Sequence, residues 1–203
     1  PSAPLRRPSG ALSRHRTLLT SADPFWHCAP SASFINFSAV PKRQRTSAGL
    51  LMYRLREGRI EVFLAHPGGP IFARRDSGHW TIPKGEVEKG ENLLETAIRE
   101  FQEEVSVVPS GDYIELGWIQ QKGGKIVYAW GFKGDHDDSQ PIQSNSMKLE
   151  WPPSSGVTIE FPEVDRAQFF SLPEARRKIK ETQTPFLDRL EKALSQPNSP
   201  QKS

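Results

Sequence analysis

Three glutamates stand close together near the middle of the chain, Glu100, Glu103 and Glu104. If residues 92–104 form a helix, Glu100 lies within one turn of the other two, so the three carboxylates gather on one side. Like charges at this spacing cost an isolated helix roughly a few tenths of a kcal/mol per pair, and a bound cation removes that cost. The spacing indicates either a cation site or a solvated acidic face. Runs of charged residues are more often the second.

The same residues carry the apolar pattern of an amphipathic helix. Apolar side chains recur at i, i+3 and i+4 spacing, at Leu94, Ala97, Ile98, Phe101 and Val105. We expect this stripe to face a core.

A longer pattern surrounds the glutamates. Gly85 is followed after five residues by Glu91, then after seven by Arg99 and Glu100, the apolar Phe101, one residue, and Glu103 and Glu104. This stretch resembles the box of the Nudix hydrolase family, G-x5-E-x7-R-E-U-x-E-E-x-G-U, where U is apolar. One defining position departs, because Ser106 stands where the family has glycine. Glycine tolerates a positive φ that costs serine about 1 kcal/mol.

The resemblance implies hydrolysis of a phosphoanhydride bond with Mg²⁺ or Mn²⁺ as cofactor. The residue types suit this chemistry, since it needs neutralised phosphate charge and a positioned water, and Mg²⁺ prefers oxygen ligands. The resemblance implies Glu100 and Glu104 as ligands of one ion, with Glu103 sharing a further ion and a backbone carbonyl near Lys84 or Gly85 completing the set.

The resemblance also implies roles for the charged residues of the box. Glu103 is the expected general base and Glu100 its rival. Arg99 is expected to orient a carboxylate through a charge-assisted hydrogen bond. Glu91 is expected to brace the loop against the helix.

The approach to the box narrows the resemblance. Residues 80–85 have the form W-x-x-P-K-G, similar to the branch of the family that cleaves dinucleoside polyphosphates. This implies diadenosine tetraphosphate as substrate and ATP and AMP as products. The alternatives are a nucleoside triphosphate pyrophosphatase of the sanitising type and a Nudix-fold binding module without catalysis.

Candidate substrate-binding residues are basic or aromatic. Lys84 lies where an ammonium can meet phosphate, and Arg74 and Arg75 are either a phosphate clamp or solvated loop charges. Tyr128 and Trp130 alternate with Val127 and Ala129 along an expected strand, and either fill a core or stack on a base. Glu150, Glu160 and Glu163 are candidates for an additional carboxylate from beyond the box.

The remaining pattern predicts strands around the box and helices near the end. Strands are expected at 47–55, 59–65, 80–85, 113–121, 125–133, 147–151 and 164–170, helices at 173–181 and 185–194, and a long loop within 139–162. Such a mixture favours an α/β or α+β fold. The resemblance specifies a Nudix-type α/β/α sandwich with a mixed sheet.

Composition assigns the chain to one domain at 47–195. Its 203 residues are 35% apolar, which suits one core. Of the net charge of +3, residues 1–46 contribute +6 and the remainder −3. We expect a disordered basic leader at 1–46, with a transit peptide and a nucleic-acid arm as alternatives, and a frayed tail at 196–203.

The expected partners and location follow from the same composition. The single cysteine, Cys28, excludes an internal disulfide and agrees with a cytoplasmic location, while organellar targeting by the leader stays open. No apolar run reaches the length that a membrane helix needs. We expect a small nucleotide as partner, and neither a membrane nor a nucleic acid; the sequence gives no oligomeric state.

Overall fold

The computed structural model describes residues 45–137 and 140–196. The expected leader falls almost wholly outside these ranges, as do Cys28 and most of the expected tail. Among the described residues, no helix is long and apolar enough to cross a bilayer.

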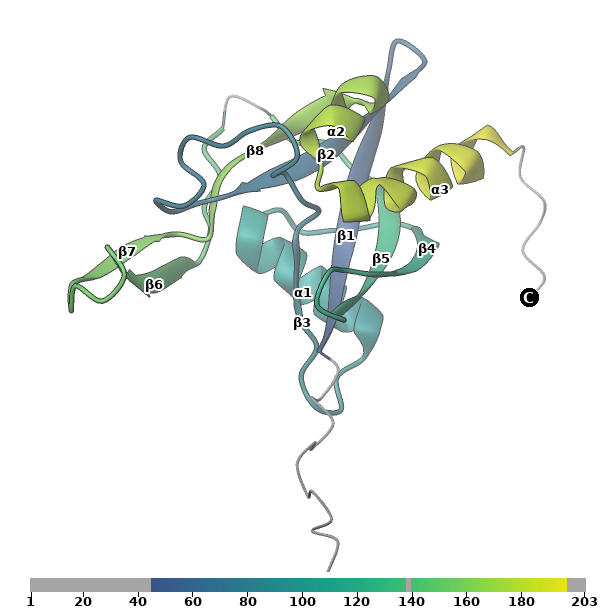
Figure 1. Cartoon of the computed structure of the whole chain (residues 1–203). Coiled ribbons are helices and arrows are strands. Elements are labelled where there is room, and N and C mark those ends of the chain that lie inside the picture. Colours follow the sequence, from purple (N-terminus) through teal and green to yellow (C-terminus); the bar gives the residue numbers. More distant parts are fainter. Residues whose placement is uncertain (1–44, 138–139, 197–203) are drawn as a thin grey trace, which may run out of the picture. The chain divides into compact units, whose positions relative to one another are not determined.

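A mixed sheet forms the centre of the fold (Figure 1). β1 (Thr46–Arg56) forms the expected antiparallel hairpin with β2 (Arg59–Pro67) and runs parallel to β5 (Ile126–Lys133). β4 (Tyr113–Gln120) borders β5, and β8 (Val164–Ser171) borders β2, so that the order is β4-β5-β1-β2-β8.

The short strand β3 (Lys84–Glu86) pairs with the first half of β1, where Lys84 lies opposite Gly49. The second half of β1 pairs with β2. One edge of β1 therefore has two successive neighbours. The chain that leads into the box contacts both hairpin strands, because Thr81 pairs with Ala65 of β2 and the carbonyl oxygen of Pro83 accepts the N–H of Leu50 of β1.

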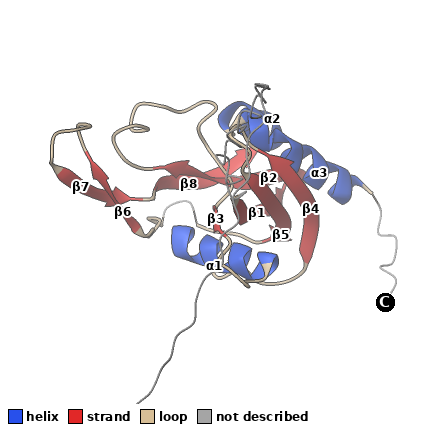
Figure 2. Ribbon diagram, turned by 60° about the horizontal axis from the view of Figure 1, so that its bottom comes forward, coloured by secondary structure: helices blue, strands red, loops and turns tan. Residues whose placement is uncertain are grey.

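The side chains of β1 alternate between two cores. Leu50 and Met52 pack with α1 (Leu93–Val105), whereas Leu51 packs with α2 (Leu172–Lys178) and α3 (Thr184–Ser195). Figure 2 shows α1 on one side of the sheet and α2 and α3 on the other. This is the expected α/β/α sandwich with a mixed sheet.

α1 lies within one residue of its predicted limits. The Asn92 side chain caps the helix by accepting from the N–H groups of Leu94 and Glu95, as short polar side chains do at helix N-termini. The expected stripe faces the core, with Ala97, Phe101 and Val105 buried and Leu94 and Ile98 packed against them. Ser106 ends the helix in the left-handed conformation, with φ 56°.

Three expected elements differ from the structure. Residues 80–85 do not form one strand: Trp80 and Thr81 make isolated bridges and only Lys84–Glu86 joins the ladder, because Pro83 has no N–H to donate. The expected loop at 139–162 contains β7 (Thr158–Pro162), which pairs with β6 (Ser146–Glu150) in an exposed ribbon.

The third difference lies near the end of the chain. The helix expected at 173–181 ends at Lys178, and a short 3-10 turn, η1 (Glu181–Gln183), follows. The extended residue Ile179 between them pairs with Trp80. Tertiary pairing thus ends the helix before its pattern does.

Candidate active site

Glu104 is a carboxylate buried at the end of the box helix. Its side chain belongs to the inner face of α1 and is 5% exposed, and its Oε2 accepts the backbone N–H of Lys84 at 3.1 Å. Burial raises the pKa of Glu104 to about 8; the Lys84 charge opposes this, and the charges of Glu163 and Glu100 add to it. A carboxyl so placed holds a proton unless a cation displaces it.

Glu100 lies one turn earlier and rests against the backbone of β3. A Cβ on Gly85 would fall 1.8 Å from the Glu100 carboxyl carbon, so any residue other than glycine forces this carboxylate to move. The Glu100 side chain is 17% exposed. Burial raises its pKa, while the hydrogen bond from Arg99 opposes the shift.

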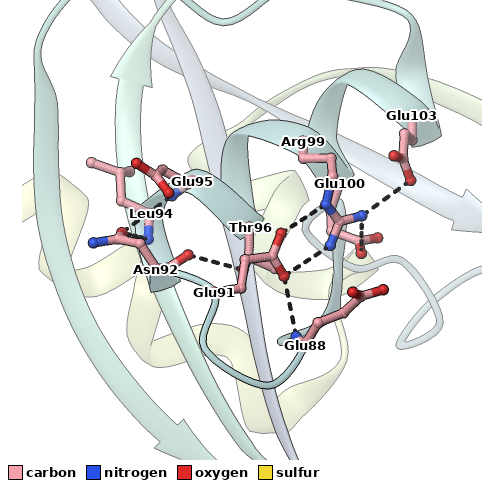
Figure 3. Close-up of polar contacts among 9 residues, drawn as sticks. All are labelled: Glu88, Glu91, Asn92, Leu94, Glu95, Thr96, Arg99, Glu100 and Glu103. Atoms are coloured by element: carbon pink, nitrogen blue, oxygen red, sulfur yellow. Dashed lines mark hydrogen bonds and ion pairs between the residues drawn. The ribbon is translucent and has the colours of Figure 1, made fainter.

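Arg99 links the carboxylates of the box (Figure 3). Its Nε and Nη2 donate to the two carboxylate oxygens of Glu91 at 2.9 and 3.2 Å, the bidentate geometry that arginine favours. Its Nη1 lies 2.8 Å from Glu100 and 3.3 Å from Glu103. One guanidinium therefore fixes the positions of three glutamates.

Glu91 connects this network to the preceding loop. Its Oε2 also accepts the backbone N–H of Glu88 at 3.1 Å. The hydrogen bonds from Arg99, and then the one from Glu88, lower the pKa of Glu91 to about 2. Glu91 is thus anchored by the helix and the loop together, the bracing position expected from the sequence.

The three carboxylate candidates from beyond the box lie in two different places. Glu163, between β7 and β8, is the one whose charge acts on both Glu100 and Glu104. Glu150 accepts the N–H of Gly156 within the ribbon, and Glu160 faces Lys148 there at 4.0 Å. The structure therefore brings Glu163 to the box and leaves Glu150 and Glu160 in the ribbon.

The chain matches the protein-family model described as NUDIX domain over residues 43–190. The chain belongs to the Nudix family. Among curated Nudix relatives, the asymmetrical bis(5'-nucleosyl)-tetraphosphatase of Caenorhabditis elegans is 32% identical over 111 residues, which are 52% of this chain and 76% of that enzyme. The enzyme of the same name from Rattus norvegicus is 47% identical over 58 residues, 26% of this chain and 40% of the relative. The chain is a Nudix hydrolase acting on phosphoanhydride bonds.

A solved structure supports the same fold. The C. elegans Ap4A hydrolase binary complex superposes with a TM-score of 0.53 at 23% identity, over 73% of this chain and 98% of that one. At this identity the likeness concerns the Nudix fold alone.

Nudix hydrolases generally use divalent metal ions, and the oxygen donors of this site suit one. Glu100 and Glu104 are largely buried carboxylates whose pKa values burial raises, so a cation there would offset an existing electrostatic cost. Among residues 45–137 and 140–196, no three acidic, His or Cys side chains already converge as ligands.

The basic candidates occupy different places. Lys84 is at the box itself, where its charge acts on Glu104. Arg74 and Arg75 are exposed on the loop between β2 and β3. This loop is fixed by the buried ring of His66, which lies 2.7 Å from the carbonyl oxygen of Arg75 and 2.6 Å from Asp165. The structure thus holds the loop in place without bringing the two arginines to the carboxylates.

The aromatic candidates share one face of the sheet. The expected alternation is confirmed: Val127 and Ala129 are buried on the α2–α3 side, and Trp130 packs against the α1-side core. Tyr128 is partly buried and lies opposite Ala48 of that same core. Core packing therefore accounts for much of the burial of Trp130.

Sequence reasoning missed Trp118. It lies opposite Tyr128 in the β4–β5 pair and is 55% exposed. Cross-strand pairs share a face, so Trp118 extends the row of aromatics toward solvent. Counting back from the turn at residues 122–124 was the available signal, because the register is regular from Gln120 to Trp118 and the bulge lies beyond, between Trp118 and Glu115.

Proposed function

We propose that this Nudix hydrolase cleaves dinucleoside polyphosphates asymmetrically, converting diadenosine tetraphosphate to ATP and AMP with Mg²⁺ or Mn²⁺. The observation that carries the proposal is the packing of Glu100 and Glu104 against the β3 backbone beside Lys84. Carboxylates so placed suit a cation that holds a phosphate chain, and the charge of Lys84 acts on Glu104 from the adjoining strand. The names of the C. elegans and rat relatives support the substrate class.

When bound, a divalent cation neutralises phosphate oxygens and lowers the pKa of a coordinated water. Glu103 accepts the proton of the attacking water, since its side chain is 42% exposed and its contact with Arg99 is the longer one. Glu100 is the alternative base. Arg99 holds the carboxylates in position through its bidentate hydrogen bonds to Glu91.

One adenine stacks on the aromatic row of Tyr128 and Trp118, a contact that typically contributes about 1–3 kcal/mol per base. Trp130 supports this row from the core side. Arg74 and Arg75 bind phosphate only if the loop that carries them closes over the substrate.

The deciding experiment is a nucleotide panel with product identification in H₂¹⁸O. Diadenosine tetraphosphate should give equal amounts of ATP and AMP, with ¹⁸O in one product alone, because water attacks one phosphorus. Preference should be scored as kcat/KM. A preference of about tenfold or more for deoxynucleoside triphosphates would replace this proposal with the sanitising activity, and no turnover of any nucleotide would favour a binding module.

The base assignment needs a separate test. Glu103→Gln should lower kcat and remove the acidic limb of its pH profile, with KM little changed. If Glu100→Gln removes that limb and Glu103→Gln keeps it, the roles are reversed.

A further inference from the structure

His66 is a fully buried histidine near the end of β2. Its Nε2 lies 2.7 Å from the carbonyl oxygen of Arg75, and its Nδ1 lies 2.6 Å from a carboxylate oxygen of Asp165. A carbonyl oxygen can only accept, so Nε2 carries a hydrogen, and a proton must also lie between Nδ1 and the carboxylate. The ring therefore joins the loop after β2 to the start of β8 through both of its nitrogens.

Asp165 reaches His66 at a bulge in β8. His66 pairs with Arg166, but the next residue, Pro67, pairs with Val164. Asp165 is thus an additional residue between two paired positions. A bulge of this kind bends its strand and redirects a side chain, and here it presents the Asp165 carboxylate to the buried ring.

Glu163 belongs to the same junction and stands directly before β8. Its carbonyl oxygen accepts the N–H of Gly68 at 2.9 Å, and its own N–H donates to the carbonyl oxygen of Asn145 at 2.7 Å. The approach leaves no room for a side chain on Gly68, since a Cβ there would lie 2.1 Å from the carbonyl oxygen of Pro162. The chain that follows His66 therefore packs directly against the backbone of Glu163.

Glu163 adds a negative charge to the carboxylate side of the box. Burial raises the pKa of Glu100 and of Glu104, and the charge of Glu163 raises both further. The same field attracts a divalent cation, and its strength falls with distance. A displacement of Glu163 therefore weakens the hold of the box on a cation.

A purely structural role is the simplest alternative for His66, because buried polar groups are normally hydrogen-bonded. This role accounts for the two hydrogen bonds of the ring. It does not account for their meeting a bulge two residues from Glu163. The two roles also differ in what they predict, since a purely structural histidine affects stability and leaves the cation affinity of the folded protein unchanged.

We propose that His66 is a positioning residue of the hydrolase, which holds Glu163 beside the cation-binding carboxylates of the box. The bond between Nδ1 and Asp165 fixes the bulge at the start of β8, and the bond from Nε2 to Arg75 keeps the ring in place. His66 acts through Asp165 and Glu163, not by contact with the substrate. The inference rests on the proposed function for the cation alone, and not for the nucleotide.

The test is Mn²⁺ binding in the absence of nucleotide, measured by isothermal titration calorimetry. Asp165→Ala and Asp165→Asn remove the same charge, but only the asparagine amide can donate to Nδ1 of a neutral His66 ring. Asp165→Ala should therefore have a Kd for Mn²⁺ about fivefold above that of Asp165→Asn. Equal Kd in the two folded variants would overturn the proposal.

A second comparison tests the route through Glu163. In a Glu163→Gln background, Asp165→Ala and Asp165→Asn should bind Mn²⁺ alike, because the charge that one of them displaces is absent. Arg166→Gln is the matched control, since Arg166 lies 3.5 Å from Asp165 and its side chain is half exposed, and it should not raise Kd. An undiminished difference in the Glu163→Gln background, or equal weakening by Arg166→Gln, would refute the route.

His66→Phe keeps a ring in the buried place and removes both hydrogen bonds, so it should raise Kd as Asp165→Ala does. Thermal melting gives the folded fraction, and the Asp165 variants decide the question if His66→Phe does not fold. No Mn²⁺ binding by the wild-type chain would reject the proposed cofactor and this role together. Mn²⁺ binding that depends on Asp165 in a protein that leaves diadenosine tetraphosphate intact would reject the proposed substrate and keep the role.

Discussion

Two buried polar side chains approach the lead into the box from opposite faces of the sheet, and they are treated differently. On the α2–α3 face, the Gln183 amide is fully buried and donates to Thr81 Oγ1 at 2.8 Å while accepting the Ile82 N–H at 3.0 Å. On the α1 face, Glu104 has the Lys84 N–H as its hydrogen-bond donor and like charges around it. The neutral, satisfied group stabilises the fold, whereas the under-compensated group is available for chemistry.

The largest effect on turnover should come from neutralising the carboxylates on the α1 face of the sheet. Glu104→Gln and Glu100→Gln should each lower kcat by about a thousandfold or more, because an electrically neutral amide cannot replace a carboxylate as cation ligand. Both variants should fold. Steady-state kinetics in Mg²⁺ measures the effect, and wild-type rates in EDTA or in the Glu104→Gln variant would show that this glutamate serves only the fold.

The opposite side should respond in stability instead. Gln183→Leu leaves the Ile82 N–H and the Thr81 hydroxyl without their partner inside the core, which typically costs about 1–3 kcal/mol. Urea unfolding should show this loss, and kcat of the folded fraction should stay near the wild-type value. A variant of normal stability with a hundredfold lower kcat would remove the contrast between the two faces.

The pH dependence of stability should also distinguish the two sides. The folded pKa of Glu104 is raised from its ordinary value of 4.5 to about 8, so the folded protein holds this proton more tightly than the unfolded chain does. Its contribution is full below pH 4.5 and is lost as pH rises to about 8. Glutamine does not titrate there. In EDTA, the Tm of Glu104→Gln should therefore match that of wild type near pH 4.5 and exceed it by roughly 5 °C above pH 8. A constant difference across this range would contradict the assignment, and Gln183→Leu should show just such a constant offset.

The smallest effect is expected at the end of α1. Ser106 holds φ 56°, a strain of about 1 kcal/mol for a non-glycine residue. Its Oγ donates to the carbonyl oxygen of Gln143 at 2.7 Å, a bond with a net value of about 1 kcal/mol. Ser106→Gly removes both, so Tm and kcat should change little. A fall in Tm of about 5 °C or more would show that the hydrogen bond outweighs the strain.

The carboxylates on the α1 face could be predicted from the sequence because their pattern is local. The stripe through Phe101 and the spacing of the glutamates lie within one helix, and Arg99 reaches Glu91 across eight residues. The hydrogen-bonded Gln183 on the α2–α3 face could not be predicted, because Gln183 meets Ile82 across 101 residues of sequence. The bridge between Ile179 and Trp80 is likewise one that no periodicity indicates. The strand at Thr158–Pro162 was missed because proline, serine and glycine precede it in a stretch without a core-facing pattern.

The exposed β6–β7 ribbon has a closed base. The N–H of Glu163 donates to the carbonyl oxygen of Asn145 at 2.7 Å, and the N–H of Val164 donates to the Ser144 hydroxyl at 3.0 Å. The chain therefore leaves and re-enters the domain at one point, where hydrogen bonds from residues outside the ribbon hold the two ends together. Residues 146–162 are consequently a place where evolution, or a protein engineer, can lengthen, exchange or remove a segment while Glu163 stays anchored beside the box.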